Sequence, residues 1–146
     1  MNEFQIVRDI ACAKEEVFAA LIDFDRAPDW NSSVIEAKRK SDAPLAVGDT
    51  IVYVGKFLGR VFESDAEVSE YVPSTRIGTK STSGPFHLEI DNRLESIDGG
   101  TRLTSDFRGE SRGFFKIAEP VIVRLSKNLF ESSTDNLKAL LEAHSI

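Results

Sequence analysis

The chain has 146 residues, a formal net charge of −6 and one cysteine. This length suits one domain, predicted over residues 1–146, in which roughly two-thirds of the unfolded surface is buried without a disulfide or metal. An acidic chain without a basic stripe argues against nucleic acid and anionic membranes as partners, because binding to either requires positive charge against phosphates.

The compartment is inferred from the cysteine and the apolar stretches. The single Cys12 excludes an internal disulfide and suits a reducing compartment. Residues 1–5 lack the basic and apolar regions of a signal peptide. No apolar stretch approaches the roughly 20 residues that span a bilayer. We therefore expect a cytoplasmic protein without membrane insertion.

The first thirty residues predict a strand and two short helices. Phe4, Ile6 and Ile10 alternate with other residues at the period of two that is typical of a strand. Residues 14–23 change to helical spacing with acidic residues in the first turn, where negative charge suits the helix dipole. Residues 25–30 contain a proline and indicate a second short helix or turn.

Strand-like runs fill the middle of the chain, at residues 34–40, 49–57, 60–72, 76–81, 86–97 and 101–110. The last two form the clearest hairpin, because Asp98-Gly99-Gly100 supplies the backbone angles of a tight turn. Alternation places one set of residues on the inner face of the sheet: Phe62, Ser64, Ala66, Val68, Val72, Phe86, Leu88, Ile90, Asn92, Leu94, Leu103, Ser105 and Phe107. His87 falls on the outer face.

The last segment, residues 113–144, predicts one long amphipathic helix. Its apolar residues are Phe114, Ala118, Val121, Ile122, Leu125, Leu129, Leu137, Leu140 and Leu141. Pro120 indicates either a bend or a short helix before the main one, with the proline then in the first turn of the main helix. We expect Leu125, Leu129, Leu137 and Leu140 to face a concave antiparallel sheet, which gives an α+β fold with seven strands around a C-terminal helix.

Several short phrases resemble the helix-grip superfamily, which includes START domains, birch-pollen-allergen-like proteins and the polyketide cyclase/dehydrase family. The phrases are Ile10 to Phe18, Pro28 to Asn31, Gly48-Asp49, Val68 to Pro73, Gly100 to Leu103, and Leu137 to Glu142. The resemblance implies an apolar cavity between sheet and helix. It also implies a lipid, sterol, hormone or polyketide ligand, with a minority of members catalysing cyclisation, dehydration or hydroxylation. These phrases mark turns and core packing, so they transfer no catalytic residue.

A mostly apolar pocket with a few polar groups suits a hydrophobic ligand that bears one or two oxygens. The residues predicted to bind it are Arg8, Trp30, Tyr53, Phe62, Phe86, Leu88, Ile90, Asn92, Ser105, Phe107, Val121 and Leu125. Structural roles remain open for several of them. Arg8 can reach solvent from the sheet edge, Trp30 can pack, and Tyr53 can lie on either face. Asn92 lies among apolar inner-face residues, where burying its amide costs free energy unless the amide is hydrogen-bonded.

The sequence offers few groups for catalysis. His87 and His144 are poorly placed for a metal site or a cavity base, and Cys12 has no histidine partner. No nucleophile elbow, phosphate loop or dinucleotide motif is present, so no metal or cofactor is expected. The primary hypothesis is binding or transport of a small hydrophobic molecule. The alternative is a polyketide cyclase/dehydratase-like enzyme in which Arg8, Tyr53 or Asn92 polarises a carbonyl.

Overall fold

The computed structural model describes residues 2–144, except for the side chains of residues 114 and 115. Its elements in chain order are β1 (Asn2–Ile10), α1 (Lys14–Ile22), η1 (Phe24–Asp29), β2 (Val34–Arg39), β3 (Thr50–Phe57), β4 (Arg60–Val72), β5 (Arg76–Ser81), β6 (Phe86–Ile97), β7 (Gly100–Ser111), η2 (Gly113–Lys116) and α2 (Glu119–His144). The two η elements are short 3₁₀ helices.

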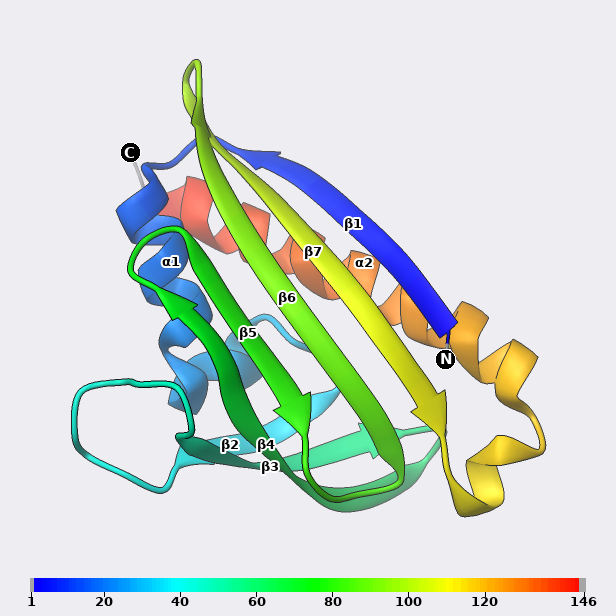
Figure 1. The fold of residues 1–146 in the computed structure, drawn as a ribbon. Helices are drawn as coiled ribbons and strands as arrows, with labels where there is room; N and C mark the ends of the chain where they lie inside the picture. The colour runs from blue at the N-terminus through cyan, green and yellow to red at the C-terminus, as the bar shows by residue number, and fades with distance from the viewer. Residues whose placement is uncertain (1, 145–146) are drawn as a thin grey trace.

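The seven strands form one antiparallel sheet in the order β1-β7-β6-β5-β4-β3-β2. The sheet is strongly curved, and α2 lies along its concave side (Figure 1). Each strand pairs with its neighbour in the chain except β1, which closes against β7. This arrangement confirms the α+β fold predicted from the sequence.

The β6–β7 hairpin has the predicted faces. Gly99 adopts a φ of +81° in the turn, a value that favours glycine, and Ile97 then pairs with Gly100. Leu103, Ser105 and Phe107 are all buried on the concave side, as alternation predicts.

A bulge corrects the prediction for the end of β4. The pairing of β4 with β5 shifts register between Val68 and Glu70. A bulge exchanges the two faces of the strand beyond it. Tyr71 therefore turns inward and stacks on Phe18, with ring centroids 5.9 Å apart, whereas Val72 is 48% exposed. The expectation that Val72 shares the inner face is wrong.

The region of the proline follows one of the two predicted arrangements. The short η2 precedes the main helix, and α2 begins at Glu119, so Pro120 occupies its first turn. A proline is tolerated there because the N–H that it lacks has no partner within the helix.

The predicted apolar stripe of α2 is partly wrong. Leu137 is 1% exposed, which confirms its position against the sheet, but Leu125 is 36% exposed. The buried face also includes Ser133, whose hydroxyl lies 3.2 Å from that of Ser32. A prediction based only on apolar residues therefore places the sheet-facing side of the helix wrongly at its start, where it includes the partly exposed Leu125.

The hydrophobic core occupies one end of the concave face, where α1 and η1 also cover the sheet (Figure 1). Its sheet residues are Ile10, Ala37, Ile51, Val68, Ile77, Leu94 and Leu103, and its helix residues include Val17, Phe18, Leu21, Phe24 and Leu137. Further along the same strands, the concave face meets only the first turns of α2. A cavity lies at this second end.

Candidate functional site

The cavity has a volume of about 200 Å³ and is lined mainly by apolar atoms. The sheet contributes Asn2, Phe4, Val34, Tyr53, Gly55, Phe57, Phe62, Ser64, Ala66, Thr79, Ser81, Phe86, His87, Leu88, Ile90, Phe107, Gly109, Glu110 and Ser111, and α2 contributes Ile122, Val123, Ser126, Leu129 and Phe130. Asn31 and Ser33, just before β2, complete the lining. Pockets for drug-sized ligands usually measure roughly 300–1,000 Å³. This cavity therefore fits a small molecule or one part of a larger one.

Phenylalanine side chains form two opposite parts of the wall. Phe86 makes edge contacts with Phe57 and Phe62, each at a centroid distance of 5.5 Å. Phe107 stacks between Phe4, at 4.8 Å, and Phe130, at 4.7 Å. Aromatic pairs of this kind hold the rings in fixed orientations. The wall therefore presents ring faces and edges suited to flat apolar groups.

Gly55 permits one of these contacts. A β-carbon added at Gly55 would lie 2.8 Å from the tip of the Phe62 ring. Real side chains do not approach this closely, so the glycine leaves room for the ring across β3.

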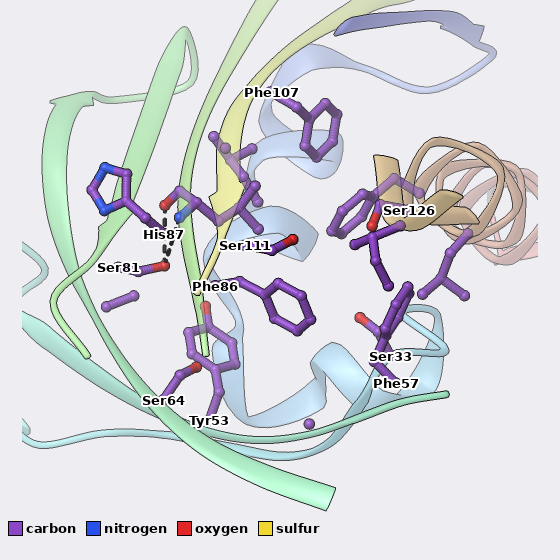
Figure 2. A pocket seen from close by; sticks show the side chains of 18 of the residues that line it. Ser33, Tyr53, Phe57, Ser64, Ser81, Phe86, His87, Phe107, Ser111 and Ser126 are labelled. Atoms are coloured by element: carbon purple, nitrogen blue, oxygen red, sulfur yellow. Dashed lines mark hydrogen bonds between the residues drawn. The ribbon is translucent and has the colours of Figure 1, made fainter. Parts of the chain in front are cut away.

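Hydroxyl groups are the main polar feature of the cavity, and Figure 2 shows them around the aromatic side chains. The Ser33 hydroxyl donates to Asn31 at 2.7 Å, and the Ser81 hydroxyl accepts from the Leu88 N–H at 3.1 Å. Within the described residues, the hydroxyls of Tyr53 and Ser64 have no hydrogen-bond partner. Burial raises the pKa of Tyr53 well above its ordinary value, so this phenol keeps its proton and can donate a hydrogen bond to a ligand.

Six of the predicted ligand-binding residues line the cavity: Tyr53, Phe62, Phe86, Leu88, Ile90 and Phe107. The other six lie outside the lining: Arg8, Trp30, Asn92, Ser105, Val121 and Leu125.

Protein partners account for three of the six residues outside the lining. Arg8 donates to Asp135 on α2 at 2.6 Å, which ties the sheet edge to the helix. Asn92 accepts a hydrogen bond from Ser105. The polar groups of Arg8, Asn92 and Ser105 are thus used within the fold.

The remaining three residues lie in apolar packing or at the surface. Trp30 packs against the core, and its carbonyl accepts a hydrogen bond from Asn136 at 3.3 Å. Val121 is 57% exposed and Leu125 is 36% exposed, because the start of α2 is rotated relative to the predicted stripe.

His87 is among the residues that border the cavity, but its side chain does not enter it. Its imidazole points away from the cavity in Figure 2, and Nε2 lies 3.1 Å from Glu89 Oε2, two residues along the same face of β6. This agrees with the predicted outward position.

Sequence reasoning places Leu129 of α2 against the sheet, and Leu129 lines the cavity, but it misses Ser126 and Phe130 on the same helix and Phe57 at the end of β3. Phe57 lies four residues beyond Tyr53 and therefore on the same face of β3. Once Tyr53 is known to line the cavity, strand periodicity predicts that Phe57 lines it too. Ser126 and Phe130 lie one turn apart on α2. A serine carries no hydropathy signal for a buried face, which is why the sequence does not reveal this row.

The described residues contain no group of three or more His, Cys, Asp or Glu side chains arranged to hold a metal ion. Among residues 2–144, no helix is long and apolar enough to cross a membrane.

The curved sheet, the long covering helix and the cavity between them define a helix-grip protein. The chain belongs to the family described as polyketide cyclase/dehydrase and lipid transport, whose model matches residues 1–142. None of the curated proteins compared with it matches significantly.

Solved structures from three organisms share this fold. A START superfamily protein from Mycobacterium smegmatis has a TM-score of 0.82 at 15% identity, with 97% of each chain covered. A Thermus thermophilus protein has a TM-score of 0.78 at 19% identity and covers 99% of this chain and 100% of its own. The Zhui aromatase/cyclase of a Streptomyces species has a TM-score of 0.77 at 12% identity, covering 97% and 93%. At these identities the likeness concerns the fold alone.

Proposed function

We propose that this protein binds or transports a small hydrophobic molecule, lipid-like or polyketide-like, that carries one or two oxygen atoms. The observation that supports this most directly is the Tyr53 hydroxyl, which lies in the cavity beside aromatic side chains, without a hydrogen-bond partner among the described residues. A ligand oxygen that accepts from the Tyr53 hydroxyl would supply the hydrogen bond that no described protein group makes.

The proposed binding residues are those whose side chains meet in the cavity: Tyr53, Phe62, Phe86, Leu88, Ile90 and Phe107. They belong to the one domain proposed for residues 1–146. The family description includes lipid transport, which agrees with an apolar site. A cytoplasmic location remains part of the proposal because the single Cys12 is free and buried.

Catalysis is the second candidate, and Tyr53 is the residue that would carry it. A neutral phenol can stabilise a developing oxyanion by donating a hydrogen bond. Cyclisation and dehydration also require a group that accepts a proton. His87 points away from the cavity, and Arg8 and Asn92 are held by protein partners. Glu110 supplies a carboxylate to the lining, but its side chain is 41% exposed and lies 4.0 Å from Lys116. Binding is therefore the function that the described residues favour.

A fluorescence titration with the apolar probe anilinonaphthalene sulfonate tests the proposal. We expect saturable, micromolar binding to the wild type. Ser126→Leu fills the cavity from α2 and should abolish the binding, because the Ser126 side chain lies in the cavity wall (Figure 2). Ser132→Leu is the matched control on the same helix, since Ser132 is exposed.

Two outcomes contradict the proposal. The first is a wild-type protein that binds no apolar probe. The second is an equal loss of binding in Ser126→Leu and Ser132→Leu, which would show that the probe binds outside the cavity. Native mass spectrometry of freshly purified protein supplies an independent readout, in which a co-purifying mass identifies the ligand. Turnover of an aromatic polyketide analogue, lost in Tyr53→Phe, would favour the enzyme.

A further inference from the structure

The solvent face at the start of α2 is unusually apolar. Ile117, in the turn before α2, is 90% exposed, and Val121 and Leu125 are 57% and 36% exposed. Val121 and Leu125 are spaced by four within α2 and so lie on one side of the helix, while Ile117 is exposed in the turn that leads into it. In Figure 1 this stretch, coloured yellow to orange, lies at the edge of the molecule. Contiguous exposed apolar side chains usually mark an interaction surface.

The same face is basic although the chain is acidic. Residues 112–128 contain four basic side chains and one acidic side chain, while the rest of the chain carries 14 basic and 23 acidic residues. Arg124 and Lys127 are exposed and form no ion pair with any described residue. The overall charge of −6 therefore hides a local charge of opposite sign.

The one acidic residue in this stretch is turned away from solvent. Glu119 accepts hydrogen bonds from the Ser111 N–H at 3.0 Å and from Asn2 at 2.8 Å, and its side chain is 18% exposed. Its hydrogen bond with Ser111 is the largest cause of a lowered pKa, so the carboxylate stays charged but is occupied within the fold. It also pairs with Lys116, at 3.2 Å. Within residues 112–128, the charged side chains that form no ion pair with a described residue are therefore all basic. Glu131, one turn beyond Lys127, interacts electrostatically with Arg8.

We propose that this docking face, formed by Ile117, Val121, Arg124, Leu125 and Lys127, binds peripherally to the surface of a bilayer that contains anionic phospholipids. Helices that lie in the membrane interface combine an apolar side with Lys and Arg. Anionic headgroups attract basic side chains, and the acyl boundary accepts the apolar ones.

The charge pattern favours a bilayer over other occupants. A second copy presenting the same face would oppose two like-charged clusters around Arg124 and Lys127, which is unfavourable. A nucleic acid would meet the basic side chains but would leave Ile117 and Val121 against water. A lipid surface accommodates both kinds of side chain.

The docking face lies directly behind the cavity wall. The same turns of α2 that carry Val121 and Leu125 outward place Ile122 and Ser126 in the cavity. Docking would therefore bring the helix that covers the cavity to the membrane surface. The inference goes beyond the proposed function, because the docking face is defined by solvent-exposed residues and does not require an occupied cavity.

Vesicle co-sedimentation tests the inference. The vesicles contain phosphatidylcholine either alone or with about 30 mol % phosphatidylglycerol. We expect the wild type to bind the anionic vesicles only, and less at high salt. Replacing both Arg124 and Lys127 with Gln should lower the partition coefficient by about tenfold or more. Independently, Ile117→Ser with Val121→Ser should lower it by about tenfold.

Matched controls come from the opposite side of the molecule. Lys38→Gln with Lys40→Gln removes the same charge from exposed positions at the end of β2. Val47→Ser with Val72→Ser removes exposed apolar groups from the loop before β3 and the β4–β5 turn, far from the start of α2 in Figure 1. Both controls should bind like the wild type. Circular dichroism verifies folding, and probe binding in the cavity should persist in every variant.

Three results would overturn the inference. The first is wild type that does not bind anionic vesicles. The second is an equal loss in the control variants, which would place the contact elsewhere. The third is sedimentation velocity showing a dimer that Ile117→Ser with Val121→Ser dissociates, which would assign the docking face to a second copy. None of these results depends on whether the cavity binds a ligand.

Discussion

The Ser105 hydroxyl donates a hydrogen bond of 2.5 Å to the side-chain oxygen of Asn92, across the β6–β7 pair. Ser105 is 3% exposed, so the loss of its acceptor leaves a buried hydroxyl unpaired. We predict that Asn92→Ala destabilises the protein by about 1–2 kcal/mol and leaves probe binding unchanged. Urea unfolding and a probe titration measure the two effects. Weaker binding at unchanged stability would instead make Asn92 a ligand contact.

The Tyr53 hydroxyl should discriminate between ligands. Tyr53→Phe removes the hydroxyl and keeps the ring, so an apolar ligand loses nothing, whereas a ligand carbonyl loses one hydrogen bond. We expect the affinity for acetylnaphthalene to fall by about five- to tenfold and that for ethylnaphthalene to stay constant, as measured by calorimetry. A parallel loss for the two ligands would show that the variant perturbs cavity shape and would contradict the hydrogen bond.

The helix face can be verified with two leucines. Leu137 is 1% exposed and packs in the core, so Leu137→Ala should cost about 2–5 kcal/mol of unfolding free energy. Leu125 is 36% exposed, and Leu125→Ala should cost about 1 kcal/mol or less. Urea unfolding of both variants provides the comparison. A larger loss at Leu125 would restore the face predicted from apolar residues alone.

Acid should loosen the junction of β7 with α2. The Ser111 N–H, then the Asn2 side chain, holds the pKa of Glu119 below its ordinary value. A lowered pKa stabilises the fold above the unfolded pKa, and this contribution is lost as the pH falls through the folded pKa. We expect the Ser111 amide signal in NMR spectra to move with the titration of Glu119 in the acid range. Glu119→Gln keeps an acceptor oxygen and should remove this titration.

Local signals predict most of the fold. The predicted strands of residues 76–81 and 86–97 have their observed bounds, because alternation and turn glycines act within a few residues. The prediction misplaces Val72 because a bulge depends on the pairing of β4 with β5, which is not visible in β4 alone. It misplaces Leu125 because Ser126 and Ser133 form part of the covered face without being apolar.

The site is predicted less completely for a related reason. Tyr53 and Phe86 follow strand alternation, so their positions in the wall are accessible from the sequence. Whether a polar group faces a ligand or a protein partner depends on residues far along the chain. Arg8 meets Asp135 through the fold of the whole chain, and nothing near Arg8 in the sequence indicates it.

The division of the concave face into a filled end and an open end links conformational stability to ligand occupancy. A molecule that enters the cavity binds the native state and has no equivalent site in the unfolded chain. By mass action, a ligand at about a hundred times its dissociation constant raises the unfolding free energy by about 2.7 kcal/mol. The melting temperature should therefore rise with ligand concentration. A thermal-shift screen can then rank candidate ligands by affinity, whether or not the protein catalyses a reaction.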